Sequence, residues 1–406
     1  MKDAVSSILA PKRAFPSVAR AALGRIGSRV HTGTLVIETP DGETLTFSGQ
    51  DDPQPLVHWQ LKSWQPLWAL LSGGVTAFAE TYLAGEWATP DLTALMRFAI
   101  ANERYFGTAV RTNLLTRLAA RLHHRMNANS RAQARRNIAY HYDLGNAFYG
   151  HWLDGTMTYS AAVFADADEP LEAAQTRKYA RLAGLAGIRD GDDVLEIGCG
   201  WGGVVDYAAS HYDARITGVS ISDAQLEYAG ERIRNAGLAP RAQVENCDYR
   251  DITGRYDRIV SIEMFEAVGE AYWETYARKL HALLKPGGAA ALQVITIDEA
   301  RFDNYRREPD FIQKYIFPGG MLPSYPALEQ TFAQAGLRIS ESYRCGHDYA
   351  RTLAAWRQRF DAAWPRIRNL GFDARFRRMW HFYLAYCEAG FREDSIDVVQ
   401  IRLEHA

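Results

Sequence analysis

The stretch VLEIGCGWGG, residues 194–203, constrains the fold of this chain more than any other. An apolar run that contains Glu196 leads into a loop with four glycines, and the helix-like segment VVDYAASHY follows. Glycine tolerates positive φ and lets the backbone approach a ligand closely. A strand, a glycine-rich loop and a helix in this order are typical of the start of a doubly wound nucleotide-binding sheet.

The chain after residue 190 continues to alternate strand-like and helix-like segments. RITGVS, AQVENC, YDRIVSIEM, AALQVITI and DVVQIRL are predicted strands, and SDAQLEYAGERIRNAG and YWETYARKLHALL are predicted helices. Ser222 is a suitable N-cap for the first of these helices, and KPGG ends the second. The alternation predicts an α/β fold with a seven-stranded, mostly parallel sheet and helices on both faces.

The sequence before residue 127 has a different organisation. Two alternating runs flank a Pro-Asp-Gly turn at residues 40–42 and predict a hairpin. A helical stretch, interrupted by a proline, follows over residues 67–102. We therefore expect a small α+β domain over residues 1–126 and a catalytic domain over residues 127–406.

Two insertions interrupt the strand–helix alternation, at residues 298–325 and 350–392. We expect both to lie over the carboxyl ends of the strands, where ligands bind in such sheets. The second insertion is rich in aromatic residues, which predict either a helix core or an apolar slot for a long substrate.

Composition restricts the class of protein. With 47% hydrophobic and 23% charged residues, the chain has the composition of a soluble globular protein. Its four cysteines lie far apart without a C-x-x-C pair, which argues against a zinc site and indicates a reducing cytoplasm. We expect no metal site, no membrane-spanning segment and no signal peptide.

Positive charge gathers in one tract of the chain. Residues 111–136 contain seven arginines, and no acidic residue occurs between Glu103 and Asp143. One interpretation is a solvated basic helix and linker. The other is a surface that meets anionic lipid headgroups.

The glycine loop alone does not decide between two nucleotide cofactors. Gly198, Gly200 and Gly203 also fit the dinucleotide pattern G-x-G-x-x-G. That pattern requires an acidic residue near the end of the second strand, and the strand ends instead at Ser220. S-adenosylmethionine (SAM) is therefore favoured over NAD.

Two acidic residues suit SAM. Glu196 lies beside the loop, where a carboxylate can face the cationic sulfonium, and Asp248 follows the third strand, where it could accept from the adenine amine. The alternative for Glu196 is a cap on a turn.

Longer stretches resemble the cyclopropane-fatty-acyl-phospholipid synthase family, which includes the mycolic acid methyltransferases. They occur in the family's order and cover almost all of residues 137–403: YHYDLGNAFYGHWLDGTMTYS, VLEIGCGWGG, TGVSISDAQ, IVSIEMFEAVGEAYW, DFIQKYIFPGGMLPS, DYARTLAAWRQRF and YLAYCEAGF. The N-terminal part resembles that of the longer bacterial members.

The resemblance implies a set of residues that bind SAM. They are Tyr142, Tyr159, Ser160, Gly198, Gly200, Gly202, Ser220, Gln225, Asp248 and Tyr249, in addition to Glu196. For the three tyrosines the alternative is ordinary core packing.

The resemblance also implies the chemistry. Methyl transfer to an alkene leaves a carbocation, and family members are expected to deprotonate it with a bound bicarbonate. Glu266, Tyr349 and the backbone of Ile295 match residues that hold this anion. Gln293 stands where many members have His, and Ala161 stands where many have Cys. Gln can still hold an anion through hydrogen bonds, whereas Ala cannot.

Two matched residues have simpler alternatives. Glu266 could be a carboxylate that only stabilises the start of a helix. Cys387 matches a cysteine once assigned as a nucleophile in the family, but no covalent step is needed, and we interpret it as a packed thiol.

The expected activity is SAM-dependent cyclopropanation of unsaturated phospholipid acyl chains. The alternative product is a methyl-branched chain, because the departures at positions 161 and 293 bear on which proton the carbocation loses. The protein is expected in the cytoplasm at the inner face of the membrane, with a homodimer allowed through the N-terminal domain. A lipid-binding protein that keeps SAM as a ligand and a small-molecule methyltransferase are the competing interpretations.

Overall fold

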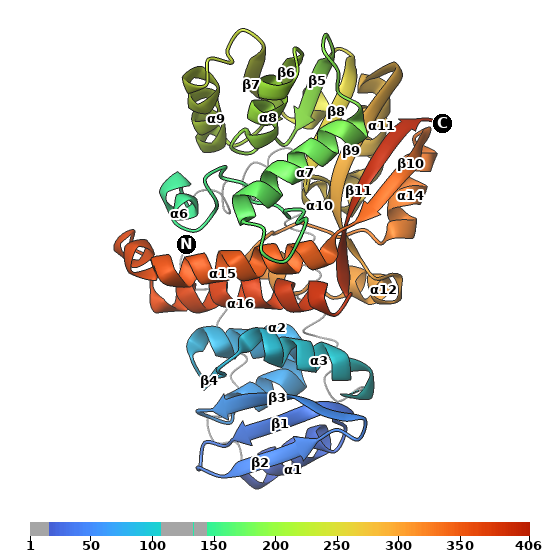
Figure 1. Cartoon of the computed structure of the whole chain (residues 1–406). Helices are drawn as coiled ribbons and strands as arrows, with labels where there is room; N and C mark the ends of the chain where they lie inside the picture. Colours follow the sequence, from blue (N-terminus) through green and yellow to red (C-terminus); the bar gives the residue numbers. More distant parts are fainter. Residues whose placement is uncertain (1–15, 107–132, 134–143) are drawn as a thin grey trace. The chain divides into compact units, whose positions relative to one another are not determined.

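The computed structural model describes residues 16–106, Gln133 and residues 144–406 (Figure 1). The chain divides into two compact units, Met1–Ala120 with Phe372–Glu393, and Arg121–Gly371 with Asp394–Ala406. The predicted domain boundary at residues 126–127 and most of the arginine tract at 111–136 lie outside the described residues.

The first unit is a small α+β domain. Its elements are α1 (Pro16–Gly27), β1 (Thr32–Glu38), β2 (Thr44–Ser48), β3 (Asp52–Leu61), α2 (Gln65–Ala84), β4 (Trp87–Ala88), α3 (Leu92–Phe106) and α16 (Ala374–Arg392). The strand order is β2-β1-β3-β4. The predicted hairpin is confirmed, because β1 and β2 pair antiparallel across a turn in which Gly42 has a φ of 86°.

Helix α16 joins this unit although it comes late in the sequence. The Thr93 hydroxyl donates to the buried carboxylate of Glu388 at 3.1 Å, and Arg97 pairs with Glu393. The Arg378 guanidinium also donates to the Leu83 carbonyl at the end of α2. Residues 372–393, which the sequence places in an insertion of the catalytic domain, therefore pack with the N-terminal helices.

The second unit is the α/β domain. Its elements are α6 (Asn146–Gly150), α7 (Leu171–Ala186), β5 (Asp193–Ile197), α8 (Gly203–His211), β6 (Arg215–Ser220), α9 (Asp223–Asn235), β7 (Ala242–Asn246), η2 (Tyr249–Asp251), β8 (Tyr256–Ile262), α10 (Phe265–Val268), η3 (Glu270–Tyr272), α11 (Trp273–Leu283), β9 (Leu284–Ile297), α12 (Glu299–Arg307), α13 (Phe311–Tyr315), α14 (Tyr325–Gln334), β10 (Leu337–Arg344), α15 (Gly346–Asn369) and β11 (Ile396–His405).

The seven strands form one sheet in the order β10-β11-β9-β8-β5-β6-β7. Strands β9, β8, β5, β6 and β7 pair parallel, and β11 and β10 extend the sheet antiparallel. The central strand β5 is buried on both faces apart from its first residue, which explains its nearly continuous apolar sequence. The predicted seven-stranded, mostly parallel sheet is confirmed.

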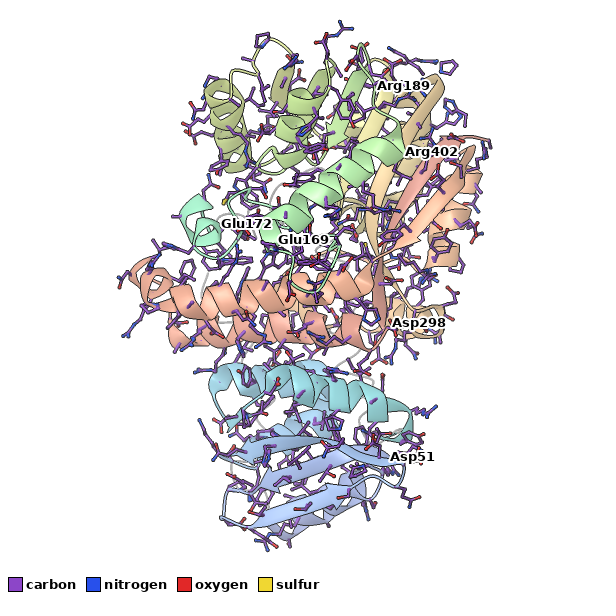
Figure 2. All side chains as sticks on the ribbon, in the orientation of Figure 1. Asp51, Glu169, Glu172, Arg189, Asp298 and Arg402 are labelled. Carbon is purple, nitrogen blue, oxygen red and sulfur yellow. The ribbon has the colours of Figure 1, made fainter. Side chains whose placement is uncertain are left out.

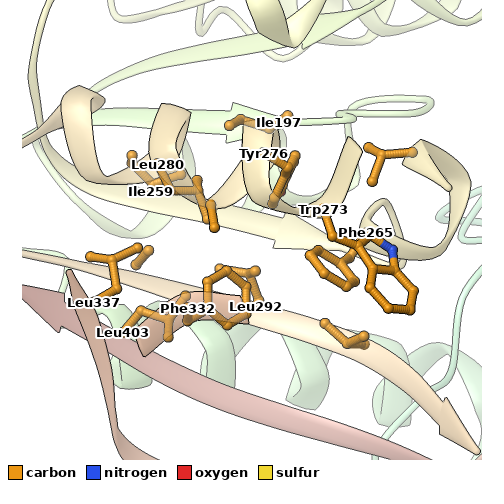
Figure 3. Packing of buried hydrophobic residues seen from close by; sticks show 14 of the residues in the cluster. Ile197, Ile259, Phe265, Trp273, Tyr276, Leu280, Leu292, Phe332, Leu337 and Leu403 are labelled. Carbon is orange, nitrogen blue, oxygen red and sulfur yellow. The ribbon is translucent and has the colours of Figure 1, made fainter. Parts of the chain in front are cut away.

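An apolar cluster fixes the segment that follows β8 (Figure 3). Phe265 is 1% exposed and stacks on Trp273 with ring centroids 5.3 Å apart. The ring centroid of Phe332 on α14 lies 5.6 Å from that of Phe265, and Leu292 of β9 belongs to the same cluster. This packing holds the backbone on both sides of Phe265, where two glutamates stand.

The insertion at residues 298–325 begins where β9 ends. Asp298, labelled in Figure 2, caps α12 by accepting from the backbone N–H of Ala300. The chain returns through a parallel bridge between Ile297 and Ser324, and the Met321 N–H donates to the Glu266 carbonyl at 2.9 Å. The insertion therefore contacts the carboxyl end of the sheet, as predicted. Across residues 16–106 and 144–406, we find no helix with the length and apolar character needed to cross a bilayer.

Candidate active site

The loop after β5 needs glycine at three positions. Gly198, Gly200 and Gly202 have φ values of 85°, 51° and 79°, which side chains rarely adopt. A Cβ atom on Gly202 would lie 2.9 Å from the Cβ of Ala229, and one on Gly198 would lie 3.3 Å from that of Met264. At Gly200 the nearest neighbour would be Nε2 of Gln225, 4.0 Å away. Gly198 and Gly202 thus allow close packing, whereas Gly200 borders open space.

Hydrogen bonds connect this loop to the segments around it. The indole of Trp201 donates to Oδ1 of Asn146 at 2.8 Å, and Nδ2 of Asn146 donates to the Ala224 carbonyl at 3.0 Å. The Ser220 hydroxyl donates to Oε1 of Gln225 at 3.3 Å. The predicted residues Ser220 and Gln225 therefore lie together beside Gly200, and α6 lies against the loop. Tyr142, which the sequence predicts in the same motif as α6, falls outside the described residues.

The other predicted SAM residues make contacts within the protein. The Tyr159 ring lies 5.2 Å from that of Trp356, and the Tyr249 ring lies 5.3 Å from that of Tyr276. Asp248 accepts from Nε and Nη2 of Arg250 at 2.8 and 2.7 Å. These contacts agree with the packing alternative for the two tyrosines, and the SAM-binding role of all three residues remains a prediction.

A lysine that the sequence analysis missed lies in the interior. Lys178 on α7 is fully buried, and its Nζ donates to the Ser160 hydroxyl at 2.7 Å. Burial lowers the pKa of Lys178 to about 8, although Glu263, Asp154 and Glu196 favour its charged form. This lysine is the counter-charge of a group of buried carboxyl groups.

Glu196 is one of those carboxyl groups. It is 3% exposed, and burial raises its pKa to about 8, an effect that Lys178 reduces. Its Oε2 is buried without a hydrogen-bond partner in the part of the chain that the structure describes. An unsatisfied buried acceptor next to a glycine loop fits a cationic ligand.

Glu266 and Ile295, which the family resemblance implies as parts of one anion site, are brought together. The Ile295 N–H donates to Oε1 of Glu266. Burial, and to a smaller extent the neighbouring carboxyl group of Glu263, raise the pKa of Glu266 to about 8. The Oε2 of Glu266 is buried and finds no hydrogen-bond partner among the described residues.

Tyr349 and Gln293 meet a second glutamate that the sequence analysis missed. The Tyr349 hydroxyl donates to Oε2 of Glu263 at 3.0 Å, and Nε2 of Gln293 donates to Oε1 of Glu263 at 2.8 Å. The signal was present in the stretch IEMFEAVG, where a carboxylate directly follows the fourth parallel strand. Ligand-binding residues gather at that edge of such sheets.

The pairing of β9 with β11 orients Gln293. Leu292 and Val294 belong to the apolar cluster, so that Gln293 points to the opposite face of β9. Gln400 stands opposite on β11, and its amide donates to Oε1 of Gln293 at 2.9 Å. This bond leaves the Gln293 amide nitrogen directed at Glu263.

Cys387 differs from the other predicted catalytic residues in its location. It lies on α16 in the first unit, whereas Glu266, Tyr349, Gln293 and Ile295 lie in the second. The aromatic residues of 350–392 are largely core residues: Trp356, Phe360, Trp380, Phe382 and Tyr383 are all at most 3% exposed.

Of these groups in the interior of the second unit, the acidic side chains thus outnumber the basic one. Three carboxyl groups, Glu196, Glu263 and Glu266, interact with one another or with Lys178 through an apolar interior. Met264 lies between Glu263 and Glu266 in sequence and contacts Gly198, so that the carboxyl groups adjoin the glycine loop. Such an arrangement stabilises a positive charge that forms or binds there.

Comparison with known proteins agrees with this site. The family model described as mycolic acid cyclopropane synthetase matches residues 129–401. The chain is 43% identical over 335 residues to a tuberculostearic acid methyltransferase of Mycobacterium tuberculosis, covering 80% of this chain and 78% of the relative. It is 36% identical over 338 residues to the cyclopropane-fatty-acyl-phospholipid synthase of Escherichia coli, covering 82% and 84%.

Solved structures give the same result. A crystal structure of a mycolic acid cyclopropane synthase complexed with SAH and CTAB has a TM-score of 0.62 and 29% identity, and the match covers 66% of this chain and 97% of that one. The glycine loop, the mixed sheet and the match over residues 129–401 lead to one conclusion: the chain belongs to the mycolic acid cyclopropane synthetase family of SAM-dependent methyltransferases.

Proposed function

We propose that the protein transfers a methyl group from SAM to the double bond of an unsaturated phospholipid acyl chain and closes a cyclopropane ring. The observation that carries this proposal is the group of buried carboxyl groups that adjoins the glycine loop. A soluble acceptor with a lone pair, such as an amine, needs only to be aligned with the methyl group of SAM. An alkene becomes a carbocation, which needs negative charge in a dry site.

The residues present fit SAM. The open side of Gly200, the buried acceptor of Glu196 and the Ser220–Gln225 pair would hold it. SAM supplies an electrophilic methyl group in this chemistry. Burial of the carboxyl groups keeps water, which would trap a carbocation, away from the reacting carbons.

The interior charges divide into two roles. Glu266 has a pKa of about 8 and is mostly protonated at neutral pH, so that it contributes a dipole rather than a full charge. Glu263 accepts three hydrogen bonds and is the better candidate for the charged carboxylate. A fixed negative charge stabilises a developing cation more than mobile water does.

A second product has its own support. The relative at 43% identity is named as a tuberculostearic acid methyltransferase, which favours methylation without ring closure. Ring closure requires immediate loss of a proton from the new methyl group. The branched product needs loss of a proton from another carbon, so the Glu263 carboxylate could serve either route, and we place cyclopropanation first because the matching family model is that of a cyclopropane synthetase.

The substrate is proposed to be taken from a membrane surface. The arginine tract at residues 111–136 would contact lipid phosphates, and the first unit would support a homodimer. If so, replacing those arginines weakens binding to anionic vesicles at low salt, and unchanged binding contradicts this part of the proposal.

One incubation tests the function. Purified protein, SAM and vesicles of a monounsaturated phospholipid are mixed, and the acyl chains are examined by proton NMR. Upfield ring-methylene signals support cyclopropanation. A retained vinyl signal with a new branch supports the second product. SAH formation only with soluble amines or hydroxyl compounds contradicts both.

A further inference from the structure

Glu263 has a backbone conformation that is unusual for glutamate. Its φ is 49°, in the left-handed region that favours glycine, directly after β8. Its N–H donates to the Gln293 carbonyl at 2.8 Å, which ties this conformation to β9. A left-handed non-glycine residue costs on the order of 1 kcal/mol or more. The fold therefore holds this side chain in a direction that an ordinary strand residue would not take.

Three segments far apart in the sequence converge on the Glu263 carboxylate. The Ala161 N–H and Nε2 of Gln293 both donate to Oε1 at 2.8 Å. The Tyr349 hydroxyl donates to Oε2 at 3.0 Å. A carboxylate that accepts hydrogen bonds from three donors is stabilised in its charged form.

The Lys178 ammonium also supplies a counter-charge for this carboxylate. Burial raises the pKa of Glu263, while the three donors and the Lys178 ammonium lower it. Glu266 accepts from the Ile295 N–H, and its pKa is raised to about 8. Of the two neighbouring carboxyl groups, Glu263 is therefore the one whose hydrogen bonds and counter-charge favour the ionised form.

Among the described residues, these contacts occupy the matched donors that would hold a bound bicarbonate. The resemblance to the family implies that Tyr349 and the residue at position 293 hold this anion. Here both side chains donate to Glu263 instead. The residue at position 161 is Ala, whose backbone N–H is also directed at Glu263. A second anion at these donors would have to displace the carboxylate and bear its repulsion.

We propose that the Glu263 side chain replaces the bicarbonate and is the catalytic base of this enzyme. This inference rests on the proposed function. In the step assigned to Glu263, a C–H bond of the newly attached methyl group breaks. Its electron pair forms the bond between the methyl carbon and the cationic carbon next to the methylated one, which closes the ring. The proton passes to the Glu263 carboxylate, which returns it to water after the product leaves.

The glutamine variant is the sharpest substitution. In Glu263→Gln, Oε1 can still accept from Ala161 and Gln293, and the amide can donate to the Tyr349 hydroxyl, so that the shape is kept while the base is lost. Glu263→Ala removes the side chain and opens its space. Asp257→Asn is the matched control, because Asp257 lies at the opposite end of β8, the strand that Glu263 follows, and accepts from Lys285.

The first readout is anion binding rather than turnover. Carbon-13 bicarbonate is titrated into each protein in the presence of SAH, and line broadening measures its binding. We expect the wild type, Glu263→Gln and Asp257→Asn to show no binding. We expect Glu263→Ala to bind the ion. SAH binding in each variant, measured by calorimetry, shows that the cofactor site is intact.

The second readout is turnover with monounsaturated phospholipid vesicles. Without bicarbonate the wild type and Asp257→Asn keep full activity, and Glu263→Gln and Glu263→Ala lose about 100-fold or more. Added bicarbonate or formate raises the activity of Glu263→Ala several-fold and leaves Glu263→Gln unchanged.

Two results would overturn the inference. One is a wild-type enzyme that binds bicarbonate and loses activity when the ion is removed. The other is a Glu263→Gln variant with full turnover. Absence of product with every lipid tested would instead contradict the proposed function, while the bicarbonate titration would still decide whether Glu263 fills the anion site.

Discussion

The side-chain amide of Gln400 donates to Oε1 of Gln293 at 2.9 Å across the β11–β9 pair. Gln293 is thereby held with its nitrogen toward Glu263, and the amide cannot rotate without leaving buried polar atoms unsatisfied. Gln400 therefore acts as a positioning residue for the carboxylate.

The substitution Gln400→Leu tests this relationship. Loss of the donor leaves a buried acceptor on Gln293, at a cost of about 1 to 3 kcal/mol. We expect turnover on vesicles to fall about tenfold while SAH affinity in calorimetry stays unchanged. Gln243→Leu, on the exposed face of β7, is the control and should retain both values. Equal turnover in the two variants would show that the Gln400 bond has no such role.

Two glycine substitutions separate ligand binding from backbone strain. Gly200 and Gly237 both have positive φ, 51° and 69°, and both would accept a Cβ without close contact. Each alanine variant should lose about 1 kcal/mol of unfolding free energy in urea. Only Gly200→Ala should weaken SAH binding in calorimetry, because only Gly200 lies in the cofactor loop. Equal SAH affinities would argue against this placement of the cofactor.

Gly202→Ala should be the more damaging change to stability. Its Cβ would stand 2.9 Å from that of Ala229, in addition to the positive φ of 79°. Overpacking of this kind adds about 1 to 3 kcal/mol. Urea unfolding of this variant should show a clearly lower midpoint than Gly200→Ala, and a midpoint at or above that of Gly200→Ala would contradict the close packing.

The raised pKa of Glu266 makes a prediction about stability and pH. Between the ordinary pKa near 4.5 and the folded pKa of about 8, the folded state keeps a proton that the unfolded state releases. Its contribution to stability is therefore lost as pH rises from about 5 to 8. Glu266→Gln does not titrate, so its melting temperature relative to that of the wild type should increase over this range. A constant difference between the two melting curves would indicate an ordinary pKa.

We expect Lys178 to determine the pH at which kcat/KM falls on the acidic side of its pH profile. Its ammonium lowers the pKa of Glu263, and removing it in Lys178→Met raises that pKa. The base is charged only above its pKa, so the acidic limb of kcat/KM should move to higher pH, by about one unit. Lys285→Met removes a partly buried lysine that pairs with Asp193 and Asp257. That control should keep the wild-type limb, and an unshifted limb in both variants would contradict the account.

Much of the fold could be predicted because its signals are local. Val194 to Gly203 combine a buried strand and three positive-φ glycines, both of which are readable from residue type. Likewise, the alternation after residue 190 predicts a parallel sheet. The family resemblance, rather than spacing, assigned Glu266 and Ile295 to one site, and the structure shows a hydrogen bond between them.

The parts that could not be predicted depend on tertiary contacts. Lys178 ends the polar run QTRK on α7, a sequence typical of a solvated face, and only the fold shows that it is buried. Glu263 stands next to a matched motif, but its donors come from residues 161, 293 and 349. The association of α16 with α3 likewise joins residues 295 positions apart, Thr93 and Glu388.

The most direct test of the central claim uses SAM with a trideuterated methyl group. Wild-type protein is incubated with this SAM and vesicles of a monounsaturated phospholipid, and the acyl product is examined by mass spectrometry and NMR. If Glu263 takes a proton from the new methyl group and the ring closes, the product carries two deuterons on a cyclopropane carbon. A product that keeps all three deuterons in an intact methyl branch would contradict the account.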